Sequence, residues 1–125
     1  MCERENIKIY KYKVETTHSA LHQGSGDLEV LSTPSLIAFM ENGAKELVKE
    51  RLEDGTTTVG ININVNHLQA TKIGDEVNVE VKLVSIDKRI LSFEIKAYDS
   101  RGLIGEGTHK RCVVNVEKFL SKVNG

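Results

Sequence analysis

Apolar residues recur at spacings of three and four along residues 33–54, a period typical of an amphipathic helix with one buried face. Thr33 and Pro34 stand at its start, where a threonine N-cap followed by proline is favourable. Gly55 directly follows Asp54 and is a suitable helix terminator. The pattern predicts one long helix whose buried stripe comprises Ile37, Met40, Ala44, Leu47 and Val48.

Most of the remaining chain alternates between apolar and polar residues, which is the period of a half-buried strand. The clearest alternation covers residues 57–68 and places Val59, Ile61, Ile63, Val65 and His67 on one face. Weaker patterns predict strands at residues 7–14, 76–83, 91–98 and 103–116, separated by turn residues. The order of strand, helix and four strands predicts an α+β hotdog fold, with a curved antiparallel sheet of about five strands around one long helix.

We expect a single domain over residues 1–125, because the chain is too short for two ordinary domains. One such sheet has open edges and a thin core, so we expect edge-to-edge pairing into a homodimer, with a tetramer as an alternative. Residues 15–32 show no period and form a stretch of about 18 residues, which is long for a loop. A functional lid and a merely flexible connection are both open interpretations of this stretch.

The composition limits the partners that the protein can have. Seventeen basic and 18 acidic residues give a net charge of -1, so overall charge does not favour nucleic acid or an anionic membrane as a partner. No apolar run approaches the roughly 20 residues that cross a bilayer, and no signal-peptide core follows Met1. Cys2 and Cys112 form no metal or redox motif, and we therefore expect a cytoplasmic protein with free thiols.

Two polar residues fall where the helix and the sheet should meet. His67 closes the apolar series of its strand, so its imidazole needs either a hydrogen-bond partner or a chemical role. Glu41 borders the apolar stripe of the helix, although a surface ion pair with Lys45 would also explain it. A carboxylate beside an imidazole is a common arrangement for base or nucleophile chemistry. Thr33, eight residues before Glu41, would lie about 12 Å away along a straight helix.

The sequence gives little indication of a metal or a cofactor. His18 and His22 are four residues apart, but the glycines soon after them speak against a helix that presents both to zinc. The chain has no phosphate-binding loop, no dinucleotide fingerprint and no nucleophile-elbow motif. We therefore expect no cofactor beyond coenzyme A as part of a substrate.

Several segments, in order and at matching spacing between about residues 28 and 120, resemble the fluoroacetyl-CoA thioesterase-like branch of the hotdog superfamily. They are Thr33 with the helix start and Met40-Glu41, the stretch Gly60-Ile-Asn-Ile-Asn-Val-Asn-His67, the turn Lys72-Ile-Gly-Asp75, and Gly105-Glu-Gly-Thr-His-Lys-Arg111 leading to Phe119. The resemblance implies an acyl-CoA thioesterase with a triad of Thr33, Glu41 and His67.

In such enzymes Glu41 would attack the thioester carbonyl or act as general base, His67 would help activate water, and Thr33 would orient Glu41. By the same analogy the backbone N–H of Gly60 would bind the thioester oxygen, and Arg111 would lie near the ligand. A solvated basic strand residue is an equally good interpretation of Arg111.

The chain also departs from the family pattern. The fluoroacetate-handling members carry an aromatic lid, whereas residues 15–32 contain no aromatic residue. Asn42 and Gly43 follow Glu41 where those enzymes carry bulkier residues. We therefore expect hydrolysis of a short or medium acyl thioester and leave the acyl group open. A non-catalytic acyl-CoA or hydrophobic-ligand module is the alternative, and a hotdog hydratase is a third, because a fold does not fix a function.

Overall fold

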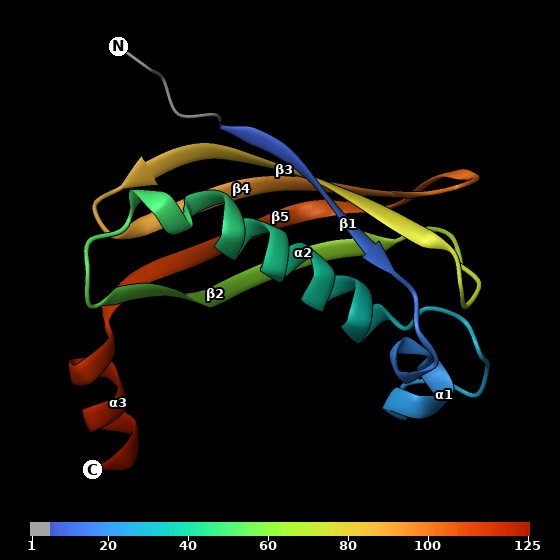
Figure 1. Cartoon of the computed structure of the whole chain (residues 1–125), viewed down its shortest axis with the longest axis horizontal. Helices are drawn as coiled ribbons and strands as arrows, with labels where there is room; N and C mark the ends of the chain where they lie inside the picture. The colour runs from blue at the N-terminus through green and yellow to red at the C-terminus, as the bar shows by residue number, and fades with distance from the viewer. Residues whose placement is uncertain (1–5) are drawn as a thin grey trace.

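The computed structural model describes residues 6–125 and has the α+β architecture that the sequence predicts. Its antiparallel sheet has the strand order β1-β3-β4-β5-β2, and one long helix, α2, lies across it (Figure 1). The main elements are β1 (Ile7–Lys13), α2 (Thr33–Val48), β2 (Thr56–His67), β3 (Glu76–Asp87), β4 (Ile90–Asp99), β5 (Gly102–Asn115) and α3 (Val116–Asn124). The five-stranded hotdog arrangement is confirmed.

The core lies between α2 and the central strands. Its largest fully buried side chains include Leu36 and Met40 from the helix, facing apolar residues of β3 and β4 such as Val79 and Phe93. Ile37 is only half-buried, whereas Leu36 and Phe39 are buried, so the buried stripe is rotated slightly from the predicted one.

Both ends of the long helix differ from the prediction. Ser32, not Thr33, is the N-cap, because its side chain accepts a hydrogen bond of 3.0 Å from the backbone N–H of Ser35. The α-helix ends at Val48 and continues only as a short 3-10 turn, η2 (Lys49–Arg51), so the predicted end near Asp54 is wrong. The capping role of Ser32 leaves the hydroxyl of Thr33 available for other contacts.

Gly43 allows α2 to approach the sheet closely. A Cβ atom at this position would lie 2.8 Å from Cγ2 of Val81, so a larger residue would push the helix away from β3. The neighbouring Asn42 accepts a hydrogen bond of 2.6 Å from the hydroxyl of Tyr12 on β1. Asn42 and Gly43, which depart from the family pattern, therefore have a packing role in this chain.

A bulge in β2 reverses part of the predicted alternation. The register between β2 and β5 shifts between Gly60 and Asn62, which places one extra residue, Ile61, in β2. Ile61 is 51% exposed, while Thr58 is buried, so the prediction that Val59 and Ile61 face the helix is wrong. Beyond the bulge Val65 packs against the core, as predicted.

The segment before α2 is folded back on itself and against the loop that follows β2. It contains the 3-10 turn η1 (Thr16–His18) and the short helix α1 (Ala20–Gln23), and isolated bridges join Ser19 to Leu31 and Val30 to Lys72. The Val30–Lys72 bridge ties this segment to the loop that follows β2, whereas the Ser19–Leu31 bridge lies within the segment. Figure 1 shows α1 and this loop near each other, at the end of the sheet that holds the start of α2.

The C-terminal end was predicted only in part. β5 ends at Asn115, whose side chain caps α3 by accepting a hydrogen bond of 3.0 Å from the backbone N–H of Lys118. This helix was not predicted from the pattern, which extended the strand to residue 116. Among the described residues, no helix is long and apolar enough to cross a membrane. Cys112 is a half-buried free thiol, and Cys2 lies outside the described residues.

Candidate active site

Thr33 and His67 meet where the start of α2 lies beside the end of β2. The hydroxyl oxygen of Thr33 is 2.8 Å from Nδ1 of His67. Nε2 of the same ring is buried and has no hydrogen-bond partner in the described part of the chain. A buried polar atom without a partner is costly, so Nε2 is a candidate contact for substrate, water or a second subunit.

The protonation state of His67 follows from its surroundings. Burial lowers the pKa of His67 from the ordinary value of 6.5, and the nearby backbone of Gln69 opposes that shift only in part. The imidazole is therefore neutral at pH 7 and can accept a proton there.

This state predicts the pH dependence of turnover. If neutral His67 accepts the proton of water, kcat rises as pH rises through the depressed pKa and is half-maximal below pH 6.5, the ordinary value for histidine. The measurement is kcat from about pH 5 to pH 8, with circular dichroism at each pH to exclude acid unfolding. The exposed His22 gives the control variant, His22→Gln, which should leave the profile unchanged. A half-maximal pH clearly above 6.5 would contradict the prediction.

A cavity of about 280 Å³ adjoins the Thr33–His67 pair. Besides this pair, its lining comprises small, aliphatic and polar residues: Ala20, Ser25, Val30, Leu31, Ser32, Leu68, Gln69 and Ala70. None of these residues is aromatic, which agrees with the lack of aromatic residues in segment 15–32. The cavity therefore has room for an acyl group without an aromatic ring over it.

Glu41 and Gly60 form a second polar region, further along α2 and β2. A Cβ atom at Gly60 would lie 2.7 Å from Oε2 of Glu41, so the carboxylate rests against bare backbone. The Glu41 side chain is 40% exposed, and its Oε2 is 3.9 Å from Nη1 of Arg111. The carboxylate is thus partly accessible, next to a cation and next to a glycine backbone.

The guanidinium of Arg111 is buried and held by several acceptors. Its Nε donates to Oγ1 of Thr58 at 2.8 Å, and its Nη2 donates to the backbone oxygen of Thr58 at 3.0 Å. Its Nη1 is 3.2 Å from Nε2 of His109. Burial lowers the pKa of Arg111, and Glu41 opposes this shift. Arg111 is 6% exposed, so interpreting it as a solvated strand residue is wrong.

The structure brings the predicted residues together in two groups, not one. Thr33 contacts His67, and Glu41 lies with Gly60 and Arg111. No hydrogen bond joins Glu41 to Thr33 or to His67 within residues 6–125. Gly60 and His67 are six to seven strand positions apart, which corresponds to roughly 20 Å along β2.

Two residues of the second group were not singled out from the sequence. Thr58 and His109 are both buried and both contact Arg111. The sequence could have indicated His109, because it lies two positions before Arg111 on β5 and therefore shares a face with it. Thr58 could not be identified, because the bulge changes which residues of β2 face the helix.

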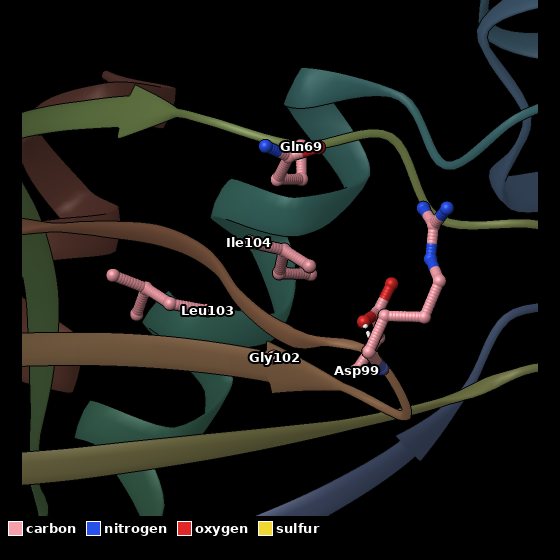
Figure 2. Close-up of a pocket in the computed structure, with 6 residues that line it drawn as sticks. Gln69, Asp99, Gly102, Leu103 and Ile104 are labelled. Atoms are coloured by element: carbon pink, nitrogen blue, oxygen red, sulfur yellow. Dashed lines mark hydrogen bonds between the residues drawn. The ribbon is translucent and has the colours of Figure 1, made fainter.

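Another cavity, of about 310 Å³, lies beside the hairpin that joins β4 and β5. Figure 2 shows Gln69 on the loop after β2, with Asp99 and Gly102 on the hairpin. Asp99 accepts hydrogen bonds of 2.8 Å from the Thr71 hydroxyl and from the backbone N–H of Arg101. Its carboxylate is thus occupied by structural contacts, and this cavity is a weaker candidate for the chemistry.

The described residues contain no group of three or more His, Cys, Asp or Glu side chains that could hold a metal ion. His18 is engaged elsewhere, because its Nδ1 accepts a hydrogen bond of 2.9 Å from the backbone N–H of Glu15 and its ring packs on Phe39.

Comparison with known proteins gives consistent matches. The model of the family described as fluoroacetyl-CoA-specific thioesterase matches residues 14–117. The fluoroacetyl-CoA thioesterase of Streptantibioticus cattleyicolor is 38% identical over 95 residues, which cover 76% of this chain and 68% of that protein.

Solved structures agree with these sequence matches. A mutant of the fluoroacetyl-CoA-specific thioesterase, in complex with fluoroacetate and CoA, has a TM-score of 0.90 and 31% identity, covering 94% of this chain and 96% of that one. A hot-dog-like protein from Thermanaerovibrio acidaminovorans has a TM-score of 0.85 and 23% identity, covering 94% and 87% of the two chains.

Proposed function

Because the chain belongs to the fluoroacetyl-CoA-specific thioesterase family and is therefore a thioester hydrolase, we propose that it hydrolyses a short or medium acyl-CoA at a site shared by two subunits. The observation that carries this proposal is the placement of Glu41 and His67. Each is next to a suitable neighbour, but the two are too far apart in one subunit to act on one carbonyl.

The free edge of β2 supports pairing with a second copy. β2 and β1 are the outer strands of the sheet. β1 carries Lys8, Lys11 and Lys13, and charged residues of this kind protect an edge from further pairing. The stretch Thr56–Asn66 of β2 has no charged residue, so its backbone is open to another strand. We therefore assign the dimer contact to β2.

Antiparallel pairing of β2 with its own copy would complete the site. Because Ile61 is the extra residue of the bulge, Asn64 lies midway between Gly60 and His67 in the strand register, and a twofold axis at Asn64 places Gly60 opposite His67 of the partner subunit. Glu41 would then face the Thr33–His67 pair of the partner subunit, and each dimer would hold two equivalent sites. This pairing removes the separation that exists in a single subunit.

The chemistry follows from the residues at such a site. The Glu41 carboxylate attacks the thioester carbonyl carbon, and the carbon–sulfur bond breaks to give a mixed anhydride and the CoA thiolate. Neutral His67 of the partner subunit takes a proton from water, which attacks the anhydride and releases the acid and free Glu41. The backbone N–H of Gly60 stabilises the negative charge on the carbonyl oxygen. If Glu41 instead acts as general base, the same placement lets it activate water directly.

The cavity beside Thr33 and His67 supports a broader choice of acyl group than fluoroacetyl. Apart from the His67 imidazole, none of its lining residues is aromatic, so no ring from segment 15–32 closes over a single small fluorinated group. The relative crystallised with fluoroacetate and CoA supports CoA as the carrier. A cytoplasmic location remains a prediction from the sequence.

The experiment that tests this function is release of free thiol from a panel of acyl-CoAs, from acetyl to long-chain and aromatic. We expect turnover of several short and medium substrates, with no strong preference for fluoroacetyl-CoA over acetyl-CoA. Tight binding without thiol release across the panel would instead support the non-catalytic binding module. Hydration of an enoyl-CoA would support the hydratase alternative.

A further inference from the structure

We propose that His109 is a positioning residue of this hydrolase, which fixes the guanidinium of Arg111 beside Glu41 and links it to the bulge of β2. The inference rests on the proposed role of Glu41. It assigns a function to a residue whose hydrogen bonds go to Asn62 and Arg111 and not to Glu41 or His67.

His109 is held on both ring nitrogens. It is 1% exposed, its Nδ1 is 2.7 Å from the backbone oxygen of Asn62, and its Nε2 is 3.2 Å from Nη1 of Arg111. Asn62 is the residue directly after the bulge in β2. One ring therefore connects the bulge to the guanidinium.

The partners fix the tautomer of His109. A backbone carbonyl can only accept a hydrogen bond, so Nδ1 carries the proton. A guanidinium can only donate, so Nε2 presents its lone pair to Arg111. Burial lowers the pKa of His109 and the charge of Arg111 lowers it further, while the hydrogen bond with Asn62 and the charge of Glu41 oppose the shift only in part, so the neutral ring is favoured. A second proton, on Nε2, would point at the guanidinium of Arg111, and two positive charges in contact in a buried site are unfavourable.

These contacts determine where Arg111 can point. Each of its three nitrogens is in contact with an acceptor, because Thr58 takes Nε and Nη2 and His109 takes Nη1. A free arginine side chain has many rotamers, and bonds at all three nitrogens restrict it to one plane. Only then does Nη1 stay 3.9 Å from Oε2 of Glu41.

Packing keeps the ring of His109 in place. Phe93 stacks on it, with ring centroids 5.9 Å apart and an interplanar angle of 27°. On another side, a Cβ atom at Gly60 would lie 3.2 Å from Cε1 of His109. The ring thus fills a space bounded by Phe93 and Gly60.

The test compares two replacements of His109. His109→Phe keeps an aromatic ring but removes both nitrogens, and we expect kcat to fall about 10- to 100-fold with KM changed less than about threefold. His109→Gln can place its amide oxygen near the position of Nε2 and accept from Arg111, so it should recover most of the lost kcat. The exposed neighbour on the same strand gives the control, Lys110→Gln, with unchanged kinetics.

A double-mutant cycle separates positioning from general destabilisation. In an Arg111→Gln background, His109→Phe should cause no further loss of kcat, because the residue through which it acts is already removed. An equal loss in both backgrounds would overturn the inference. So would equal activity of His109→Phe and the wild type.

Nitrogen NMR of the wild-type protein tests the contact without any variant. We expect the ring of His109 to be mainly in the Nδ1–H form at pH 6.5, the ordinary pKa of histidine, and a mainly protonated ring at that pH would overturn the inference. This spectrum does not depend on catalysis. If Glu41→Ala remained active, the proposed function of Glu41 would fail while the NMR result still decided the His109–Arg111 contact.

Discussion

Replacing Glu41 by glutamine is expected to lower kcat by about a thousandfold or more, with the fold intact. Glutamine has nearly the same shape but no charge, so it can neither attack the thioester carbonyl nor take a proton from water. The side chain is 40% exposed and its ion pair with Arg111 is long, at 3.9 Å, so little stability is lost. The measurement is free-thiol release at saturating acyl-CoA, with thermal unfolding of the same sample.

The matched control for Glu41→Gln is Glu46→Gln on the same helix. Glu46 pairs with Lys45 at 3.3 Å and lies outside both polar groups of the site, so its variant should keep wild-type kcat. Activity of Glu41→Gln within about threefold of the wild type would exclude Glu41 as nucleophile or base. A single turnover in heavy-oxygen water then separates the two roles, because water attack on the glutamyl carbonyl of an anhydride would label Glu41 itself.

A heterodimer that combines Glu41→Gln in one subunit with His67→Ala in the other is expected to retain roughly half of the wild-type activity. In a shared site, intact His67 of the first subunit meets intact Glu41 of the second, while the other site contains both defects. Each homodimer alone should be almost inactive. The experiment uses co-expression with two affinity tags, purification of the heterodimer and thiol release per dimer.

A second heterodimer, with both substitutions in the same subunit, is the control for this complementation. It joins a wild-type subunit to one that carries both Glu41→Gln and His67→Ala. If the site is shared, both sites of this dimer are defective and activity is almost absent. If each site lies within one subunit, this second heterodimer keeps about half of the activity and the first is almost inactive. That result would disprove the proposed pairing of β2. Elution of the native protein as a monomer would disprove it as well.

Local patterns in the sequence were sufficient for α2, for the five strands and for Glu41 and His67 as candidate residues, but not for α1 or α3. Helical spacing placed Glu41 at the border of the buried face of α2, and strand alternation placed His67 at the end of β2. These predictions depend on neighbours a few residues apart, which the sequence displays directly. The hotdog fold followed because a single apolar helix was the only cover available for the sheet.

Other features depended on contacts between distant segments. Gly60-Ile61-Asn62 continues the alternation of β2 without a break, so only the pairing with β5 shows that Ile61 is an extra residue. The same pairing brings the backbone oxygen of Asn62 within 2.7 Å of Nδ1 of His109, which lies 47 residues later in the chain. Likewise, Ser32 and Thr33 are both good N-cap residues, and only the folded backbone made Ser32 the cap.

The sequence by itself determined the types of side chain available for the chemistry and the elements that carry them. The tertiary structure alone decided which of these side chains meet, namely Thr33 with His67, and Glu41 with Gly60 and Arg111. The physical reason is that secondary structure follows from local periodicity, whereas contacts across a sheet follow from strand register, which a single bulged residue changes.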